Sequence, residues 1–339
     1  MSKSLHQPES TYRATYRGST IVLAHANKSV SEPVAQRMAK DIDWMLRGDI
    51  NVRLYTMHNA ARRQLMQYIP SNVCEQHDSS AHLLDLPDLI THIAKERREE
   101  IEELIVLSNM AGFHNGHRGI MPLLSNTKID ALRAKHRAYG PILDAVEAGL
   151  ESVPKIVFTQ PRFLGDEIQS VTGKGTMCFN RSATTYGPLH AREIPIFMGN
   201  YRRQVEDGTY RTRTTAELRR ARDEHEGIRV GRSLIGGFSL TPQDQKRLSL
   251  ELVWGCSRGG DLGSLILDHA TQAAGRSSFY ALTIRQEVAQ IFRNYPGMLD
   301  VGTMSHLQEN GEIHTYAPEH ANYNTEQRDP HFFWHPSTR

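Results

Sequence analysis

Apolar runs and stretches of helical periodicity alternate along the first half of the chain. The segment 32–46 predicts a helix, because Val34, Met38, Ile42 and Met45 recur at the spacing of one helix face. Short strands separated by helices need crossover connections, which favour a mostly parallel sheet. The predicted strands are Thr20–Ala24, Val52–Thr56, Glu103–Leu107 and Lys155–Thr159, the other predicted helices are Leu86–Glu103 and Lys128–Ala148, and an irregular connection is expected over Gln67–Asp85.

The pattern changes beyond the turn-rich segment Thr184–Ile194, where a domain boundary is predicted. Two charged helical stretches within 201–222, broken at Asp207-Gly208, precede three short strands in succession. Turn residues separate these strands, so an antiparallel arrangement is expected before the final helices. The predicted strands are Gly227–Val230, Ser233–Leu240, Arg247–Trp254 and Ser278–Leu282, and the predicted helices are Leu262–Ala274 and Arg285–Asn294. The tail, 316–339, is rich in His, Asn and Pro and has no usable period.

Length and composition narrow the class of protein. A chain of 339 residues is long enough for two domains, and its 39% of hydrophobic residues is typical of a soluble globular protein. Lys and Arg total 40 against 38 for Asp and Glu, a net charge of +2, which argues against a nucleic-acid partner. The polar N-terminal arm, 1–17, does not resemble a signal peptide, and no stretch approaches the ~20 apolar residues of a membrane helix.

Cysteine and histidine usage points to the cytosol and away from a metal centre. The three cysteines, Cys74, Cys178 and Cys256, are widely spaced and form neither a disulfide framework nor a zinc site, as is usual in a reducing compartment. Two histidine pairs occur, the first of them without a nearby Cys or acidic partner, and among 17 histidines we interpret both as chance pairs. They are His114 with His117, and His331 with His335. We therefore expect a cytoplasmic protein with no bound metal and no membrane partner.

A glycine-rich loop joins a predicted strand to an apolar helix at Arg258-Gly259-Gly260-Asp261-Leu262-Gly263-Ser264. Glycines let the backbone approach a diphosphate, and the N–H groups at a helix N-terminus favour anions. Arg258 adds a charge-assisted hydrogen-bond donor. The loop therefore predicts a diphosphate site, and the alternative is an ordinary strand-to-helix turn.

The loop, the apolar helix, the next strand and the segment Gln286–Gly297 together resemble the GNAT acetyltransferases, whose loop reads Arg/Gln-x-x-Gly-x-Gly/Ala. Arg258 and Gly263 match this pattern, whereas Asp261 stands in place of its first glycine. The resemblance implies that acetyl-CoA is the cosubstrate. The residues it implies for binding are Leu252, Trp254, Arg258, Gly259, Gly260, Leu262, Gly263 and Ser264.

GNAT enzymes position an amine against a thioester, and a base and an acid assist the transfer. Glu251 lies on the strand before the loop, where the resemblance places an acidic group, and is the predicted base. The alternative is a solvent-facing strand carboxylate. Arg293 occupies the position of the family's usual acid, a tyrosine, so Tyr295 is the neighbouring substitute, with packing as its alternative role.

The first half resembles the amino-acid kinase fold over about 18–179. Glu103–Phe113 is similar to the family's strand and Asn/Asp-x-x-Gly turn, and Thr172–Thr176 is similar to its closing Gly-x-Gly-Thr. The glycines that wrap ATP phosphates in active kinases are missing from Ala24–Lys28 and Met57–Ala61, so kinase activity is not expected.

An amino-acid kinase-like domain before a GNAT domain is the architecture of the N-acetylglutamate synthase family. The resemblance implies an α/β protein: a parallel-rich sandwich of amino-acid kinase type at 18–190, and a mixed-sheet GNAT-type domain at 195–315. It implies an amino-acid substrate, a regulatory first domain, and a homo-oligomer assembled through that domain. Thr283-Ile284-Arg285 is similar to the family's Thr-Thr-Arg, which makes Arg285 the predicted partner of a substrate carboxylate. A solvent-facing arginine is the alternative.

Three functions stay open from the sequence. The first is an N-acetyltransferase acting on a glutamate-like amino acid or a related small amine. The second is a catalytically retired homologue that acts as a regulatory or binding subunit, which Asp261 and Arg293 favour. The third is an acyltransferase that uses a different acyl donor.

Overall fold

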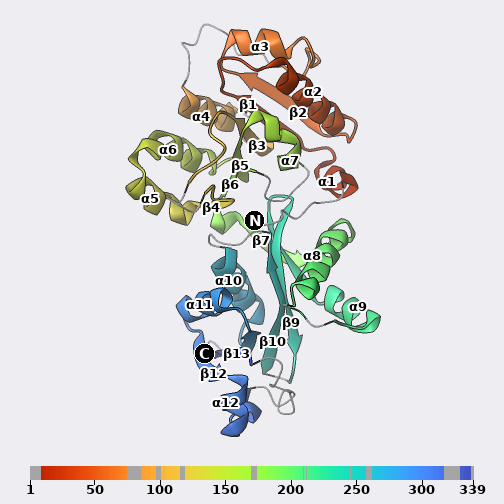
Figure 1. Cartoon of the computed structure of the whole chain (residues 1–339), viewed down its shortest axis with the longest axis vertical. Coiled ribbons are helices and arrows are strands. Elements are labelled where there is room, and N and C mark those ends of the chain that lie inside the picture. The colour runs from red at the N-terminus through yellow and green to blue at the C-terminus, as the bar shows by residue number, and fades with distance from the viewer. Residues whose placement is uncertain are drawn as a thin grey trace. The chain divides into compact units, whose positions relative to one another are not determined.

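The computed structural model describes residues 9–74, 85–96, 101–114, 119–168, 174–208, 210, 212–244, 246–256, 262–316 and 329–336. The chain divides into two compact units (Figure 1). The first contains Met1–Thr185, Arg229–Leu234 and Cys256–Asp261, and the second contains Tyr186–Ile228, Ile235–Gly255 and Leu262–Arg339. No helix within the described ranges is long and apolar enough to cross a membrane.

The first unit is built on a six-stranded sheet with the order β2-β1-β3-β5-β6-β4. Its strands are β1 (Thr20–His25), β2 (Asn51–Thr56), β3 (Ile101–Leu107), β4 (Leu123–Ser125), β5 (Lys155–Thr159) and β6 (Thr176–Phe179). The four strands β2, β1, β3 and β5 are parallel, while β6 is antiparallel to β5. The prediction of a parallel-rich α/β unit is therefore confirmed.

Helices cover both faces of this sheet (Figure 1). On one face, Val22 and Val106 share a core with residues of α4 and α6. The alternate residues of β1, Ile21 and Leu23, point to the other face and are buried as well. Strands buried on both faces explain the continuous apolar runs in the sequence. The helices are α1 (Glu9–Tyr16), α2 (Glu32–Leu46), α3 (Asn59–Leu65), α4 (Leu86–Glu96), α5 (Asn126–Lys135), α6 (Gly140–Gly149) and α7 (Leu164–Ile168).

A charged pair is buried inside the first unit. The Nζ atom of Lys155, whose side chain is 2% exposed, lies 3.0 Å from Oε2 of Glu103, which is 6% exposed. Lys155 also donates to the Tyr16 hydroxyl at 2.6 Å and to Ser233 Oγ at 2.5 Å. Burial alone would lower the pKa of Lys155, but the Glu103 charge and these contacts outweigh it and raise the pKa.

The second unit contains a seven-stranded mixed sheet with the order β12-β13-β11-β10-β9-β8-β7. Its strands are β7 (Thr185–Pro188), β8 (His225–Val230), β9 (Ser233–Pro242), β10 (Arg247–Gly255), β11 (Ser278–Thr283), β12 (Leu299–Thr303) and β13 (His331–His335). Strand β10 is antiparallel to β9 and parallel to β11. Strands β10 and β11 are parallel because the chain crosses over between them through helix α10 (Leu262–Ala274), which packs on β10.

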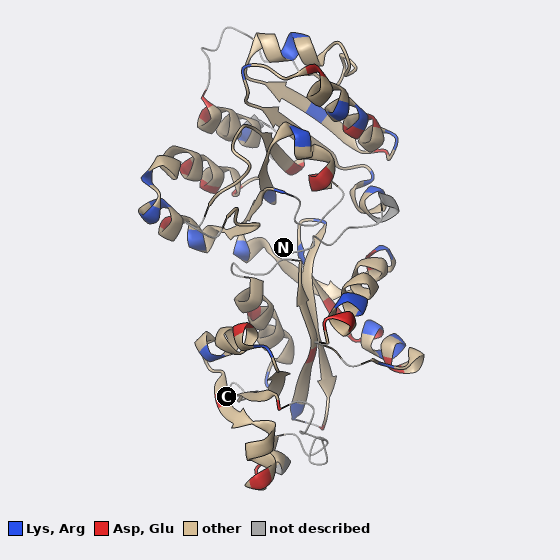
Figure 2. Ribbon diagram, in the orientation of Figure 1, with Lys and Arg blue, Asp and Glu red and all other residues tan. Residues whose placement is uncertain are grey.

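Two helices, α8 (Ile194–Glu206) and α9 (Thr215–Asp223), precede β8, and α11 (Gln286–Asn294) follows β11. Two short helices, α12 (Met304–Glu309) and α13 (Ile313–Tyr316), lie beyond β12. Figure 2 shows basic and acidic residues interspersed on helices such as α2 and α9.

Several predicted elements need correction. The helix predicted over 128–148 is two helices, α5 and α6, because Pro141 lacks an N–H donor and follows Gly140 at the start of α6. The helix predicted over 86–103 is too long, since Ile101 already begins β3; its last described residue is Glu96. The aperiodic tail supplies β13, which lies between β11 and β12. Strands β4, β6, β7 and β12 were not predicted.

Candidate functional site

Strand β10 carries a bulge near its carboxyl end. Glu251 pairs with Ser239 of β9, but the next pair is Trp254 with Gly237, so Leu252 and Val253 together oppose Phe238. Leu252 has a φ of 48°, a left-handed conformation that residues other than glycine rarely adopt. A bulge re-aims the backbone groups of its strand, and bulges are frequent beside binding and catalytic sites.

The parallel pairing between β10 and β11 stops before this bulge. Leu250 with Ala281 is the last pair, although β10 continues to Gly255 and β11 continues to Thr283. The backbone of β10 from Glu251 onward is therefore outside the ladder with β11. Beyond the bulge, the chain runs toward α10, whose described first residues are Leu262 and Gly263.

The connection between helices α8 and α9 brings two polar side chains to the bulge. The hydroxyl of Tyr210 donates to the carbonyl oxygen of Val253 at 2.6 Å. The Arg213 side chain donates to Glu251 Oε2 at 2.6 Å, and both partners are largely buried, at 15% and 27% exposure. The predicted base is thus held in an ion pair. Its second oxygen, Oε1, has no hydrogen-bond partner among the residues that the structure describes.

The predicted substrate residue Arg285 lies near the same bulge. Arg285 follows β11, which ends at Thr283 and whose Ala281 pairs with Leu250, the residue before Glu251. Burial raises the pKa of Tyr210, and the charges of Arg213 and Arg285 act against this rise. Arg285 occupies the N-cap position of α11 without a capping side-chain bond, and it donates from Nε to Glu287 Oε1 at 3.0 Å. The structure therefore brings together Glu251, Leu252 and Arg285, and it adds Tyr210 and Arg213.

Trp254, predicted to bind the cofactor, has a buried side chain. Its indole N–H donates to Nε2 of His225 at 2.8 Å, and the other ring nitrogen of His225 lies 2.9 Å from Ser239 Oγ. Burial lowers the pKa of His225 to about 3. A Cβ atom at Gly237 would lie 2.4 Å from Nε2 of this histidine, so glycine is needed there. Because its indole ring is buried, Trp254 offers only backbone groups to a ligand.

The predicted phosphate loop is described only in part. Arg258, Gly259, Gly260 and Asp261 lie outside the described residues. Leu262 is buried at the start of α10, and a Cβ atom at Gly263 would lie 2.7 Å from Ile291 of α11. Glycine therefore permits α11 to pack closely on the first turn of α10. Ser264 is half-buried on the same turn.

Tyr295, the predicted substitute acid, contacts the body of α10. Its hydroxyl donates to Asp268 at 3.1 Å and lies 3.2 Å from Thr271 Oγ1. Asp268 is about 9 Å along the helix from Leu262, at 1.5 Å per residue. Arg293, in the position of the usual acid, donates to Asp300 at 2.7 Å. These contacts give both residues a packing role in this structure.

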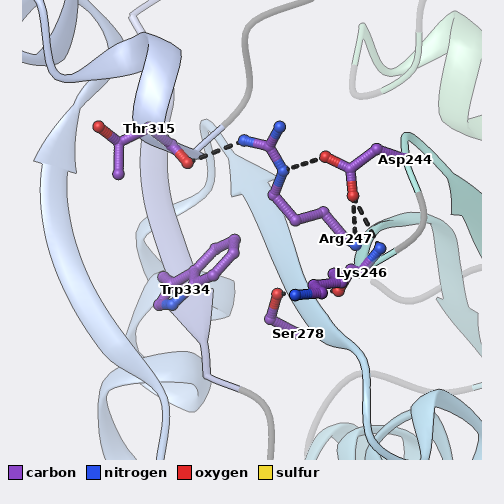
Figure 3. Close-up of a pocket in the computed structure, with 6 residues that line it drawn as sticks. All are labelled: Asp244, Lys246, Arg247, Ser278, Thr315 and Trp334. Carbon is purple, nitrogen blue, oxygen red and sulfur yellow. Dashed lines mark hydrogen bonds and ion pairs between the residues drawn. The ribbon is translucent and has the colours of Figure 1, made fainter.

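A hollow of about 550 Å³ lies at the other end of β10 (Figure 3). Arg247 spans it, bonded to Asp244 at 2.5 Å and to the Thr315 carbonyl at 2.9 Å. The remaining lining residues are Lys246, Ser278 and Trp334. The bulge residues are not among them. Within the described ranges, no group of three or more His, Cys, Asp and Glu side chains is placed to hold a metal ion.

In the first unit, the described part of the predicted Gly-x-Gly-Thr turn is closed by a carboxylate. Glu167 Oε1 accepts from the backbone N–H groups of Lys174 and Gly175, both at 2.7 Å. Burial raises the pKa of Glu167 to about 7, although these two bonds act in the opposite direction. A Cβ atom at Gly175 would lie 1.9 Å from the Phe158 carbonyl oxygen, so only glycine fits.

Tyr210, Arg213 and His225 were not predicted as site residues. Tyr210 and Arg213 lie between two charged helices, where the sequence has no motif. Their only signal is an aromatic and a basic residue in the short connection between α8 and α9. His225 begins β8 and contacts the site through Trp254.

Comparison with known proteins supports the fold. No protein-family model matches the chain, and no curated protein matches it significantly. The solved structures include N-acetylglutamate synthase from Neisseria gonorrhoeae complexed with coenzyme A and L-arginine, with 15% identity, a TM-score of 0.51 and coverage of 98% of both chains. Ard1 from Thermoplasma volcanium has 15% identity and a TM-score of 0.34, and covers 46% of this chain and 99% of its own. Naa50 from Arabidopsis thaliana in complex with a bisubstrate analogue has 13% identity and a TM-score of 0.30, over 45% and 97%.

The whole-chain match confirms the fold that the sequence predicted: an amino-acid kinase-type unit followed by a GNAT-type unit. At 15% identity the match establishes the fold and leaves the activity of this chain to the argument from its own residues.

Proposed function

We propose that this protein is an N-acetyltransferase that transfers an acetyl group from acetyl-CoA to the amine of a glutamate-like amino acid or a related small molecule. The observation that carries the proposal is the bulged end of β10, where pairing with the parallel strand β11 has already stopped. Backbone N–H groups that lie outside the ladder with β11 are suited to bind a thioester carbonyl and the oxyanion that develops on it. The solved structure with the same fold was crystallised with coenzyme A.

The second half supplies the other parts of the reaction. Arg258, Gly259, Gly260, Leu262, Gly263 and Ser264 would hold the diphosphate at the beginning of α10, as the sequence predicted. Glu251 would accept the ammonium proton through Oε1, while Arg213 fixes its other oxygen. Arg285 would exchange its bond with Glu287 for the carboxylate of the substrate. Tyr295 remains a hypothesis for the acid, on sequence grounds alone.

Assembly and location belong to the same proposal. We infer a homo-oligomer formed through the kinase-like unit, in the cytoplasm, with a regulatory and not a kinase role for that unit. The support is the resemblance in the first half, together with the carboxylate of Glu167 that occupies the N–H groups of Lys174 and Gly175. Size-exclusion chromatography with light scattering measures the oligomer directly.

A second candidate is a catalytically retired relative that binds a ligand without turnover. The specific observation in its favour is that the predicted functional groups already have partners in the chain. Glu251 is paired with Arg213 and Arg285 with Glu287, and Arg293, which replaces the usual acid, is paired with Asp300.

Release of the free thiol of coenzyme A tests the two candidates. The purified protein is incubated with acetyl-CoA and a panel of amino acids, and with longer acyl-CoAs to detect a different donor. A catalyst releases thiol in the presence of one acceptor class, and Glu251→Gln and Arg258→Ala abolish most of this release. Arg47→Ala, at an exposed arginine that follows α2 in the first unit, is the control and keeps the wild-type rate.

Binding is measured in parallel by thermal shift with acetyl-CoA. Protection without thiol release supports the retired relative. If acetyl-CoA gives no protection and no thiol is released, the acetyl-CoA site is excluded. The reason is that a ligand that binds the native state must raise its melting temperature.

A further inference from the structure

Leu252 holds a backbone conformation that its own sequence does not favour. A branched residue with a φ of 48° persists only where the surrounding structure determines it. Leu252 is 5% exposed and packs with Phe197, Tyr201 and Ala221, which belong to α8 and α9. The packing explains why the side chain is buried, but it does not by itself fix the backbone on either side.

Two polar contacts from one segment flank Leu252. On the preceding residue, Glu251 Oε2 is bound by Arg213 at 2.6 Å, and on the following residue, the Val253 carbonyl is bound by the Tyr210 hydroxyl at 2.6 Å. Val253 lies in the bulge, opposite Phe238 together with Leu252. The bulge is therefore held on both sides of its left-handed residue.

The segment that makes these contacts is itself anchored to α8. The backbone N–H of Tyr210 donates to the Gln204 carbonyl at 3.0 Å, and the Tyr201 hydroxyl accepts from the backbone N–H of Arg213 at 2.8 Å. The rings of Tyr201 and Tyr210 stack, with centroids 6.2 Å apart. A hydroxyl placed by its own ring and backbone contacts is a preorganised donor, because its position does not depend on a bound ligand.

We propose that Tyr210 and Arg213 are positioning residues that hold the β10 bulge in the conformation needed for acyl transfer. Tyr210 fixes the direction of the Val253 carbonyl, and the adjoining peptide N–H groups take their directions from the same bulge. Because burial raises the pKa of Tyr210, its hydroxyl stays protonated and keeps donating at neutral pH. The catalytic part of this inference rests on the proposed function, while the structural part does not.

Tyr210→Phe tests the inference, because it removes one hydroxyl and keeps the ring. We expect peptide hydrogen exchange over 251–254 to accelerate about tenfold, since the Val253 carbonyl loses its donor. In thiol release we expect kcat to fall about tenfold with the KM for acetyl-CoA within about twofold of wild type, the pattern of a contact that matters mainly in the transition state. Tyr68→Phe, which removes an exposed hydroxyl bonded to Glu32 at 2.9 Å in the first unit, is the matched control and changes neither quantity.

Arg213→Gln removes the other contact of this clamp, by which we mean the bonds from Tyr210 to Val253 and from Arg213 to Glu251. It replaces Tyr210→Phe as the test if that variant does not fold. Unchanged exchange over 251–254 in a folded Tyr210→Phe or Arg213→Gln protein would overturn the inference. Faster exchange with a proportionate rise in KM and no fall in kcat would also overturn it, because that result describes a binding contact. If the wild-type protein releases no thiol from any acyl-CoA, the proposed function fails, and the exchange measurement still decides whether the clamp exists.

Discussion

Replacing Lys155 by Met removes the positive member of the buried pair in the first unit and leaves its packing volume nearly unchanged. Glu103, 6% exposed, then loses the cation 3.0 Å from its Oε2 atom. Tyr16 and Ser233 lose their shared donor at the same time. Breaking a buried pair from one side costs about 3–5 kcal/mol, because it leaves an uncompensated charge in a medium of low polarity.

A free-energy loss of this size is large enough to measure by thermal unfolding. A unit of about this size loses roughly 2–4 °C of melting temperature per kcal/mol, so Lys155→Met should lower the transition of the first unit by roughly 6–20 °C. The double variant Lys155→Met with Glu103→Leu removes the unpaired charge and should recover most of the loss. Arg47→Met is the control, because its pair with Asp43 is 73% and 53% exposed and contributes about 0.5 kcal/mol or less.

Differential scanning calorimetry of the wild type, Lys155→Met, Glu103→Leu and the double variant gives the double-mutant cycle, with Arg47→Met measured beside it as the control. Burial of the pair is refuted if Lys155→Met lowers the melting temperature no more than Arg47→Met does. The attribution to charge is refuted if the double variant is as unstable as the single one, since the loss would then come from packing or from the two hydroxyl contacts.

Three further predictions concern single sites. Gly175→Ala should prevent stable folding of the first unit, because the new Cβ would lie 1.9 Å from a backbone oxygen of Phe158, whereas Gly199→Ala, with no atom within 4 Å, should stabilise α8 by about 0.5–1 kcal/mol in the same thermal melts. The pKa of His225 is lowered to about 3 in the folded state from 6.5, so the unfolded state binds its proton first and stability should fall as the pH drops from about 6.5 toward 3. His225→Asn should flatten that part of the guanidinium midpoint profile, and an unchanged acid slope would contradict the assignment. Arg285→Gln should raise the KM for the amino-acid acceptor at least about tenfold and leave the KM for acetyl-CoA unchanged in thiol release, whereas equal changes in both would remove Arg285 from the acceptor site.

The sequence predicted most of the fold where one local pattern decides the structure. Helices α2 and α10 and strand β5 have the predicted bounds, since each combines uninterrupted periodicity or an apolar run with clear ends. The break between α5 and α6 was missed, although Pro141, which disfavours a helix interior, is a local signal for it. Strand β13, by contrast, has no alternation: His331-Phe332-Phe333-Trp334-His335 lies between two strands of the sheet, and pairing so distant in sequence leaves no local signal.

The candidate site was predictable only in outline. Glu251 and Arg285 were found because they adjoin the predicted loop and strands. The ion pair between Arg213 and Glu251 joins residues separated by 38 positions, and no motif predicts it. The bulge depends on the register between β9 and β10 and on a left-handed leucine, which intrinsic preferences disfavour. Tertiary contacts, and not local propensity, determine both features.

Strand β13 also determines when the second unit is able to fold during synthesis. Among the strands that the structure describes, β12 has β13 as its one neighbour, and β11 meets β13 on the side away from β10. Until His335 has left the ribosome, β11 therefore presents an open edge of the kind that recruits strands from other chains. The sheet of the second unit is incomplete until then, and it is during this interval that chaperone protection would matter most.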